Sequence, residues 1–439
     1  MRNLSRFSIA FFFLISISGA AGVAHAEEPY SDSLGLSVPL AAPAAETSAS
    51  DQPATSDAGN RAALPSEPPL ISAIQRARTL LRERIDTDVE RRTKPEVVSG
   101  YDVWVNVTLA VWDARTDGIS LIEARKNGTK LKFEGLEDPG IRVRFNNGVN
   151  TQFAVDDGDK VVVAIRYPIF KDVTVKKKHP RYELQDVVYA PYSPALRQPE
   201  VVSYGRGTLK SYITQAFDAY RAAGIRSRAF PDKLMADVVD PQLVESIALI
   251  EHLNVGALDG QNAQAALESV YVTVAANQED AFDYSRSPAG ALGMVQFIPS
   301  TYALMAKRAE LGLIKDFTAG MSDPVNAIKA EIAYLDAELA SMPLSVKDLY
   351  YVDNDRVKEY LAAGYNAGDT RVKRAIALWG DAWSETHEEE IATLAKKKGT
   401  RSAAVKAMKN ATLRAETIGY VRKMRQALKM LRPPELPMT

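Results

Sequence analysis

Residues 240–252 place one carboxylate where a general acid could work. Asp240 can cap a helix and Pro241 suits the first helical position, so the sequence predicts a helix over Pro241–Leu253. At about 100° per residue, Glu251 falls on the apolar stripe of this helix. A glutamate directed towards a core loses hydration, which raises its pKa and suits proton donation. The alternative is an ordinary carboxylate in solvent at a helix end. The stripe consists of Leu243, Val244, Ile247 and Ile250.

Three further segments combine glycine with neutral polar and aromatic side chains. They are residues 287–301 (SPAGALGMVQFIPST), 364–368 (GYNAG) and 416–421 (ETIGYV). Glycines before a helix let the backbone approach a ligand closely, and Gln, Tyr and Asn supply uncharged hydrogen bonds. Uncharged donors beside aromatic faces are typical of a sugar-binding site. The candidates for such contacts are Gln296, Tyr365, Asn366 and Tyr420.

In this order, the segments resemble the goose-type lysozyme and soluble lytic transglycosylase (SLT-domain) family, over residues 239–425. That family reads DPxLxxAIxxxES, SPxGAxGLMQxxPxT, AYNAG and ETxxYV. Glu251 stands ten positions after Pro241, where the family has its catalytic glutamate. The resemblance implies that Gln296, Tyr365, Asn366 and Tyr420 line the substrate groove, because they match groove-lining positions of the family.

The chain departs from this pattern next to the acid. His252 stands in place of the usual Ser, and Met294-Val295 in place of Leu-Met. Ser287 follows Glu251 by 36 residues, far more than in the family, so residues 254–286 contain an insertion.

The alternating valines at 270, 272 and 274 predict that this insertion is a hairpin or flap. The insertion also holds a rival acid, since Glu279 lies eight residues before Ser287, close to the family's spacing. A helix ending near Glu279 would make that residue catalytic, and the β-branched residues argue against such a helix.

The resemblance implies cleavage of the β-1,4 bond between N-acetylmuramic acid and N-acetylglucosamine in peptidoglycan, with formation of 1,6-anhydromuramic acid. It implies one catalytic carboxylate, Glu251, acting first as acid and then as base. One alternative is a hydrolytic muramidase in which Asp280 or Asp283 positions water. A second is a non-catalytic peptidoglycan-binding or assembly protein, in which the altered motifs mark lost activity.

Composition excludes several other classes. The 439 residues include 54 Lys and Arg against 55 Asp and Glu, and this balance argues against a nucleic-acid partner. The chain has no cysteine, so thiolate chemistry, disulfides and Cys-ligated metals are excluded. Its four histidines stand at positions 25, 179, 252 and 387, not at a metal-ligand spacing. We therefore expect no metal and no cofactor.

The first residues predict export. A basic start at Arg2 and Arg6, an apolar run and the ending Ala24-His25-Ala26 are typical of a cleaved signal peptide over 1–26. No cysteine follows that would carry a lipid, so the expected location is the periplasm. Residues 27–65 are rich in Ala, Pro and Ser and predict a disordered linker.

The remaining pattern predicts an α+β protein, with a small antiparallel β domain before a mainly α-helical, lysozyme-like catalytic domain. A helix is expected over 66–95, with an apolar face that includes Leu70, Ile74 and Leu81. Short runs of period two over 96–206 predict the β domain, whose role is a spacer or the docking of a cell-envelope protein. Residues 207–432 predict the helical domain, which we expect to keep its chemistry as a fragment. The predicted strands include 103–109, 130–133, 141–145, 152–155 and 160–165.

Overall fold

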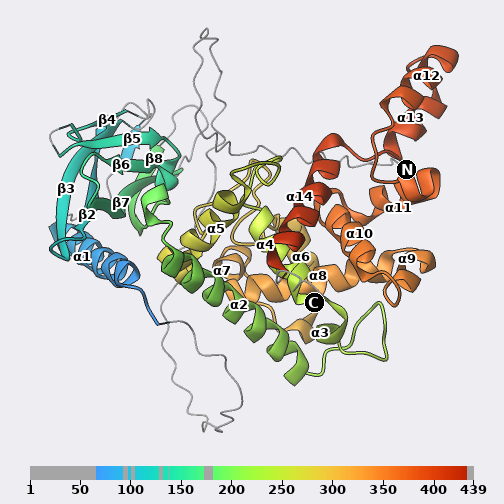
Figure 1. The fold of residues 1–439 in the computed structure, drawn as a ribbon, viewed down its shortest axis with the longest axis horizontal. Helices are drawn as coiled ribbons and strands as arrows, with labels where there is room; N and C mark the ends of the chain where they lie inside the picture. The colour runs from blue at the N-terminus through green and yellow to red at the C-terminus, as the bar shows by residue number, and fades with distance from the viewer. Residues whose placement is uncertain are drawn as a thin grey trace, which may run out of the picture. The chain divides into compact units, whose positions relative to one another are not determined.

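The computed structural model describes residues 66–91, 97–99, 104–127, 132–137, 139–172 and 181–432 (Figure 1). The predicted signal peptide and the predicted linker lie outside these residues. The described chain forms two units. The strand unit comprises residues 66–209 and Tyr271–Tyr284, and the helical unit comprises residues 210–270 and 285–432. The chain passes from one unit to the other within α2 (Pro199–Ala222) and within α5 (Ala263–Asn277), and returns to the helical unit after Tyr284.

The strand unit is built on a six-stranded antiparallel sheet with the order β1-β8-β7-β2-β3-β4. A separate hairpin pairs β5 with β6. The predicted strands at 141–145 and 152–155 are confirmed, and those starting near 103 and 160 continue further than expected. Strands β3 and β8 were not predicted. The bounds are β1 Val97–Ser99, β2 Trp104–Asp113, β3 Gly118–Asn127, β4 Phe133–Glu134, β5 Ile141–Phe145, β6 Gln152–Val155, β7 Lys160–Asp172 and β8 Arg181–Tyr189.

A β-bulge keeps the two faces of this sheet apolar. Ala110 of β2 pairs with Ala164 of β7, but the next residue, Val111, pairs with Val162, so Val163 is the extra residue of β7. Side chains alternate along a strand, so Val161 and Val163 lie on one face and Val162 on the other. The extra residue shifts this alternation by one, so Ile165 lies on the same face as Val162.

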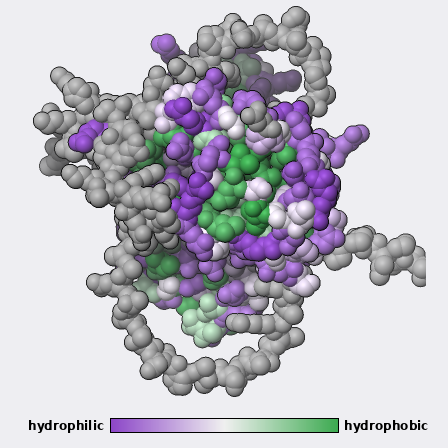
Figure 2. All heavy atoms as spheres, turned by 90° about the vertical axis from the view of Figure 1, so that its left-hand side faces the viewer, coloured by the Kyte–Doolittle hydropathy of each residue, from purple (hydrophilic) through white to green (hydrophobic). Residues whose placement is uncertain are grey.

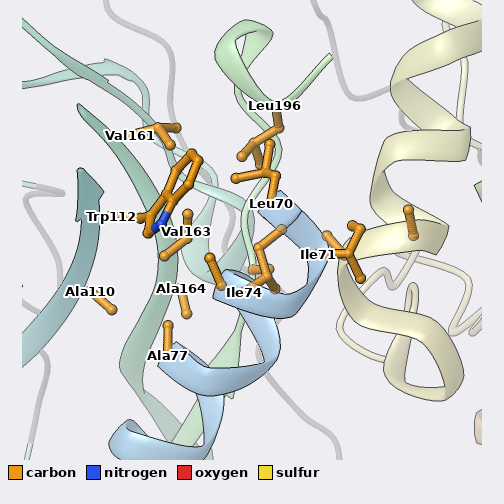
Figure 3. Close-up of a cluster of buried hydrophobic side chains, with 14 of the residues drawn as sticks. Leu70, Ile71, Ile74, Ala77, Ala110, Trp112, Val161, Val163, Ala164 and Leu196 are labelled. Carbon is orange, nitrogen blue, oxygen red and sulfur yellow. The ribbon is translucent and has the colours of Figure 1, made fainter. Parts of the chain in front are cut away.

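Each face of the sheet is covered. The hairpin β5–β6 packs on one face, where Ile141 and Phe153 meet Leu109 and Ile165. Helix α1 (Pro69–Arg91) packs on the other, as its apolar spacing predicted. Figure 3 shows Leu70, Ile74 and Ala77 of α1 directed at Trp112 and the valines of β7, with Ile71 turned towards α5.

The insertion after Glu251 is a helix, so the predicted hairpin or flap is wrong. Helix α5 continues into the 3-10 turn Gln278–Asp280. Val270, Val272 and Val274 are all buried, and so are their neighbours Tyr271 and Ala275, so the apparent alternation is part of a helix covered on nearly all sides. Burial outweighs the weak β preference of valine here.

Within the strand unit, α2 approaches α5 closely at Gly205. A Cβ atom on Gly205 would lie 1.9 Å from the carbonyl oxygen of Tyr271, so only glycine fits. The C-terminal end of α5 is held by Arg78 of α1, which donates to the carbonyls of Ala276 and Asn277 and pairs with Asp280. The Asn277 side chain in turn bonds both backbone groups of Ala190, each at 2.9 Å.

The helical unit confirms the predicted α+β class, with a helical domain after the antiparallel sheet. Among the described residues, no helix is both long and apolar enough to span a membrane. The face drawn in Figure 2 is on the side of the strand unit, and it carries a hydrophobic area ringed by hydrophilic side chains. The helices are α3 Met235–Val238, α4 Pro241–Ile250, α6 Pro299–Ala306, α7 Phe317–Ser322, α8 Pro324–Ser341, α9 Leu344–Leu349, α10 Asn354–Ala367, α11 Asp369–Trp379, α12 Glu388–Lys398, α13 Ala403–Asn410 and α14 Ala415–Leu431.

Candidate active site

Glu251 caps the C-terminal end of α4, one residue beyond the helix. The helix begins as predicted: the Asp240 side chain accepts from the backbone N–H of Gln242 at 2.7 Å, and Pro241 follows. The buried Lys358 of α10 pairs with Asp240 at 2.6 Å and so ties the start of α4 to α10. At the other end, the Glu251 N–H donates to the carbonyl of Ile247, and its side chain is only partly exposed.

Helix α14 brings a hydroxyl and a cation to this helix end. The Tyr420 hydroxyl donates to Oε1 of Glu251 at 2.6 Å. Three residues later, and so on the same face of α14, Lys423 donates to the carbonyls of Ile250 and Leu253. Carbonyls at the end of a helix have no partner within it, so the ammonium completes the end of α4. Tyr420 and Lys423 are both buried.

These surroundings set the proton affinity of Glu251. Burial raises the pKa of Glu251 to about 7, while the Tyr420 hydrogen bond and the Lys423 charge oppose the rise. Burial likewise lowers the pKa of Lys423 to about 8, against the attraction of Glu251. Glu251 can therefore gain or lose a proton near neutral pH beside a resident cation.

The glycine-rich loop 287–298 contributes backbone and a strained glutamine. Gly293 has a φ of 74°, and a Cβ there would lie 2.4 Å from the carbonyl oxygen of Met321. Gln296 also has a positive φ, 49°, which is unusual for a residue with a side chain. Its amide Nε2 donates to the carbonyl of Gly293 in the loop at 2.7 Å and to the carbonyl of Ser285, just before the loop, at 3.1 Å.

The loop is joined to the acid through His252 and to α10 through Tyr365. Nε2 of His252 donates to the carbonyl of Met294 at 2.9 Å, and burial lowers the pKa of His252 to about 4, so its ring is neutral. The Tyr365 hydroxyl donates to the carbonyl of Val295 at 2.5 Å. His252, which departs from the family pattern, thus fixes the residue after Glu251 to the loop.

Tyr365 and Asn366 connect the remaining elements. Burial and the nearby Glu331, Glu251 and Tyr420 raise the pKa of Tyr365 well above its usual value. Asn366 accepts from the Thr417 hydroxyl at 2.8 Å, which ties α10 to α14. Helices α4, α10 and α14 lie side by side in the helical unit (Figure 1). The structure therefore brings Glu251, Tyr365, Asn366, Tyr420 and the loop of Gln296 into one connected set.

The three rival carboxylates belong to the strand unit, although the helix ending near Glu279, which the β-branched residues argued against, does form. Glu279 is exposed in the 3-10 turn after α5, within the strand unit. Asp280 pairs with Arg78 and Arg82 of α1, and Asp283 belongs to the strand unit as well.

One further carboxyl was not among the sequence candidates. Glu331 of α8 is fully buried, and neither of its oxygens has a hydrogen-bond partner in the described structure. Burial raises the pKa of Glu331 well above its usual value, and the charge of Glu251 adds to the rise. The signal that indicated Glu251 was also present here, because Glu331 lies among Ala327, Ile328, Ile332 and Leu335 on the apolar face of its helix.

Residues 258–386 match the family model of the transglycosylase SLT domain. Residues 258–386 therefore form an SLT domain, with Tyr271–Tyr284 in the strand unit and the rest in the helical unit. This supports a lytic transglycosylase or lysozyme-like function that acts on peptidoglycan. The match includes the loop of Gln296 and both Tyr365 and Asn366; it begins after Glu251 and ends before Tyr420. A comparison with curated proteins finds no match to this chain.

Within the described residues, the SLT domain shows no group of three or more His, Asp or Glu arranged to hold a metal ion. The set around Glu251 consists of carboxyl, hydroxyl and amide groups, one neutral imidazole and one ammonium. Such groups can donate and accept protons and orient uncharged hydroxyl and amide groups of a substrate.

Proposed function

We propose that this protein is a lytic transglycosylase that cleaves the MurNAc-β-1,4-GlcNAc bond with Glu251 as its catalytic residue. The observation that carries the proposal is the Tyr420–Glu251 hydrogen bond of 2.6 Å, because it joins the two outer motifs at a desolvated carboxyl. The match to the SLT family supports the substrate class.

The reaction needs one group that donates a proton and then takes one back. Protonated Glu251 gives its proton to the glycosidic oxygen as the bond from that oxygen to C1 of muramic acid breaks. The substrate's own N-acetyl group stabilises the positive charge that develops at C1. Ionised Glu251 then accepts the proton of the muramic acid 6-hydroxyl, whose oxygen bonds to C1 and closes the 1,6-anhydro ring. Because this nucleophile belongs to the substrate, its effective concentration is high and no second carboxylate has to activate water.

Glu251 suits both steps better than Glu279. A pKa of about 7 leaves both protonation states accessible at neutral pH, and Tyr420 and Lys423 stabilise the ionised form. Glu279 is exposed and belongs to the strand unit, whereas Gln296, Tyr365 and Tyr420 belong to the helical unit. Asn366 and Tyr365 are then the groups that orient the sugar and its N-acetyl group.

The first experiment compares Glu251→Gln with Glu279→Gln. We expect Glu251→Gln to fold normally and to release no muropeptides from purified sacculi, and Glu279→Gln to act like the natural protein. The reverse result would make Glu279 the acid and overturn this assignment.

The second experiment identifies the product. Mass spectrometry should find 1,6-anhydromuramic acid ends, which are lighter by one water than reducing ends. Reducing muramic acid ends would show hydrolysis and direct attention to Asp280 and Asp283. Binding to sacculi without any product would favour the non-catalytic alternative.

We also propose export to the periplasm, on the signal-peptide pattern of residues 1–26. Fractionation of cells that make the full chain should place a shortened protein, beginning at Glu27, in the periplasm. A cell-envelope protein partner for the strand unit stays a prediction.

A further inference from the structure

The segment between α11 and α14 forms a pair of helices that lies outside the family match. The match ends at residue 386, and α12 begins at Glu388. Helix α12 packs against α13, and α13 packs against α11 (Figure 1). We call residues 388–410 the α12–α13 hairpin. Because the family model stops before it, the family does not explain what this hairpin does.

One tryptophan holds both ends of the hairpin. On the entry side, the rings of His387 and Trp379 stack with 3.6 Å between their centroids and an angle of 2° between their planes. On the exit side, Nε1 of Trp379 donates to the hydroxyl of Thr412 at 3.2 Å. Nε2 of the buried His387 also donates to the carbonyl of Ala382 at 2.9 Å. The base of the hairpin is therefore fixed to the helical unit.

The hairpin separates its charges. The first turn of α12 carries three glutamates and its last turn carries three lysines. Further cations follow in the connection to α13 and in α13 itself. All six cations are exposed, and in the part of the chain that the structure describes none of them pairs with a carboxylate. They are Lys396, Lys397, Lys398, Arg401, Lys406 and Lys409.

Helix stability explains only part of this pattern. Cations in the last turn of a helix interact favourably with its dipole, which accounts for the three lysines of α12. Arg401 lies outside both helices, and Lys406 lies in the middle of α13. The chain has 54 Lys and Arg against 55 Asp and Glu, so the excess of cations here is local. Cations that cluster without partners repel each other, and such a surface is suited to a partner of opposite charge.

A groove between the two helices adjoins these cations. Its volume is about 470 Å³. It combines the apolar side chains of Leu394 and Met408 with the ammonium of Lys397 and the carboxylates of two glutamates. Such a lining suits a short peptide that carries both methyl and charged groups. The groove is lined by Glu389, Glu390, Thr393, Leu394, Lys397 and Met408.

The surface of the hairpin favours a carboxylate-bearing polymer over a membrane. A helix that lies on a membrane buries an exposed apolar face among the lipids. Among the described residues, every exposed large apolar side chain lies outside residues 388–410. The peptides of peptidoglycan carry free carboxylates and methyl groups. Their carboxylates can pair with the cations of the hairpin, and their methyl groups can pack on Leu394 and Met408.

We propose that the α12–α13 hairpin is a second peptidoglycan-binding site, which holds the carboxylate-bearing peptides of the sacculus. The choice of this partner rests on the proposed function, and the hairpin takes no part in the cleavage itself. The hairpin leads into α14, whose Tyr420 contacts Glu251. Because the peptides are attached to the glycan, binding at the hairpin keeps the protein on its substrate.

Binding to purified sacculi tests this proposal. The triple variant Lys396→Gln, Lys397→Gln and Lys398→Gln is compared with the unsubstituted chain by co-sedimentation. Both proteins comprise residues 27–439 and carry Glu251→Gln, so that the sacculi stay intact. We expect the Kd of the triple variant to be about tenfold higher at low salt, which is the combined effect of three exposed charge pairs. The difference should vanish at about 1 M salt, where the Debye length is about 3 Å.

Two matched variants are the controls. Lys210→Gln, Lys315→Gln and Lys429→Gln together remove the same charge from exposed lysines of the helical unit outside the hairpin. Lys396→Arg, Lys397→Arg and Lys398→Arg together keep the charge of the hairpin. We expect both controls to bind sacculi like the unsubstituted chain. Undiminished binding by the folded Gln variant of the hairpin, or an equal loss in the first control, would overturn the proposal.

A change in the sacculus tests the same contact without a substitution in the hairpin, and so decides even where the Gln variant folds poorly. Amidation of the peptide carboxyls should weaken binding of the unsubstituted chain about tenfold. Undiminished binding to amidated sacculi would overturn the proposal. Vesicles of phosphatidylglycerol and phosphatidylcholine test the membrane instead. Binding to these vesicles that depends on the hairpin lysines, without such binding to sacculi, would also overturn it.

Failure of this proposal and failure of the proposed function give different results. Release of muropeptides by the chain with its natural Glu251 measures the function, and co-sedimentation measures the hairpin. Binding that depends on the hairpin, without release of muropeptides, would support the second site and refute the transglycosylase. Release of muropeptides, with binding that neither the Gln variant nor amidation changes, would refute the second site alone.

Discussion

At the scale of single residues, the proposed acid is defined by three opposing influences. Burial favours the protonated form of Glu251, and Tyr420 and Lys423 favour the ionised form, which leaves the pKa at about 7. A group that donates and then accepts a proton works best with a pKa near the working pH. The position of Glu251 could be predicted from the helix pattern, but the balance could not, because Tyr420 and Lys423 lie about 170 residues further along the chain.

Tyr420→Phe tests this balance. Without the hydroxyl, the Glu251 carboxylate loses a hydrogen bond to its charged form, so its pKa rises and the basic limb of kcat/KM moves towards alkaline pH. The maximal rate should fall about 10- to 100-fold, the usual worth of a hydrogen bond to a charged group. Tyr350→Phe is the control, since that hydroxyl donates to the carbonyl of Asp237 and not to Glu251. A limb that stays in place in Tyr420→Phe would contradict the account.

Glu251→Gln should also change stability with pH. A carboxyl whose pKa rises from 4.5 unfolded to about 7 folded stabilises the fold fully only below pH 4.5, and that contribution is lost as pH rises through 7. The variant should therefore match the natural protein at pH 4 and exceed it at pH 8 by on the order of 2 kcal/mol. Chemical denaturation at both pH values measures this. Because His252 is unchanged, its own titration cancels in the difference.

At the scale of elements, the prediction of secondary structure succeeded where neighbouring residues determine the structure. It failed where contacts with distant segments determine it. The Asp240–Pro241 start of α4 and the apolar spacing of α1 are properties of neighbouring residues, and both helices form as predicted. Helix α5 was read as a hairpin because its valines suggested strands, whereas the residues that cover it come from α1, α2 and the sheet. Glu331, like Glu251, lies on the apolar face of its helix, but it belongs to none of the sequence motifs.

Gly205→Ala tests the contact that holds α5 against α2. An added methyl would overlap the Tyr271 carbonyl. Because the overlapping atoms are backbone, neither helix can move aside without disturbing its packing. We expect a loss of several kcal/mol or no soluble protein, in line with overpacking of a close-packed interior. Gly260→Ala is the matched control, because no atom lies within 4 Å of the added carbon. Equal unfolding temperatures for the two variants would contradict the close contact between Gly205 of α2 and the Tyr271 carbonyl of α5.

At the scale of the whole molecule, the helical domain expected over 207–432 does not coincide with one unit of the structure. Residue 207 lies inside α2, and Tyr271–Tyr284 belong to the strand unit although the chain on both sides of them belongs to the helical unit. Val272, Ala275 and Ala276 are buried in the core that α1 and the sheet form. Part of the insertion thus belongs to the core of the strand unit, although it lies in the sequence between segments of the helical unit. No local sequence pattern reveals this.

Two truncations follow from this arrangement. A protein of residues 66–439 should unfold at the same temperature as one of residues 27–439, because the composition of 27–65 offers little apolar surface to bury.

A protein of residues 207–439 loses the sheet and α1, so Val272, Ala275 and Ala276 become exposed and Gly205 no longer supports α5. We therefore no longer expect the fragment 207–439 to fold independently. It should aggregate or unfold at a clearly lower temperature than the protein of residues 27–439. Its release of muropeptides should fall in proportion to its folded fraction. Thermal unfolding and sacculus lysis on the same samples measure both. A stable, fully active 207–439 would show that the strand unit is a separate spacer and that the Tyr271–Tyr284 segment folds without it.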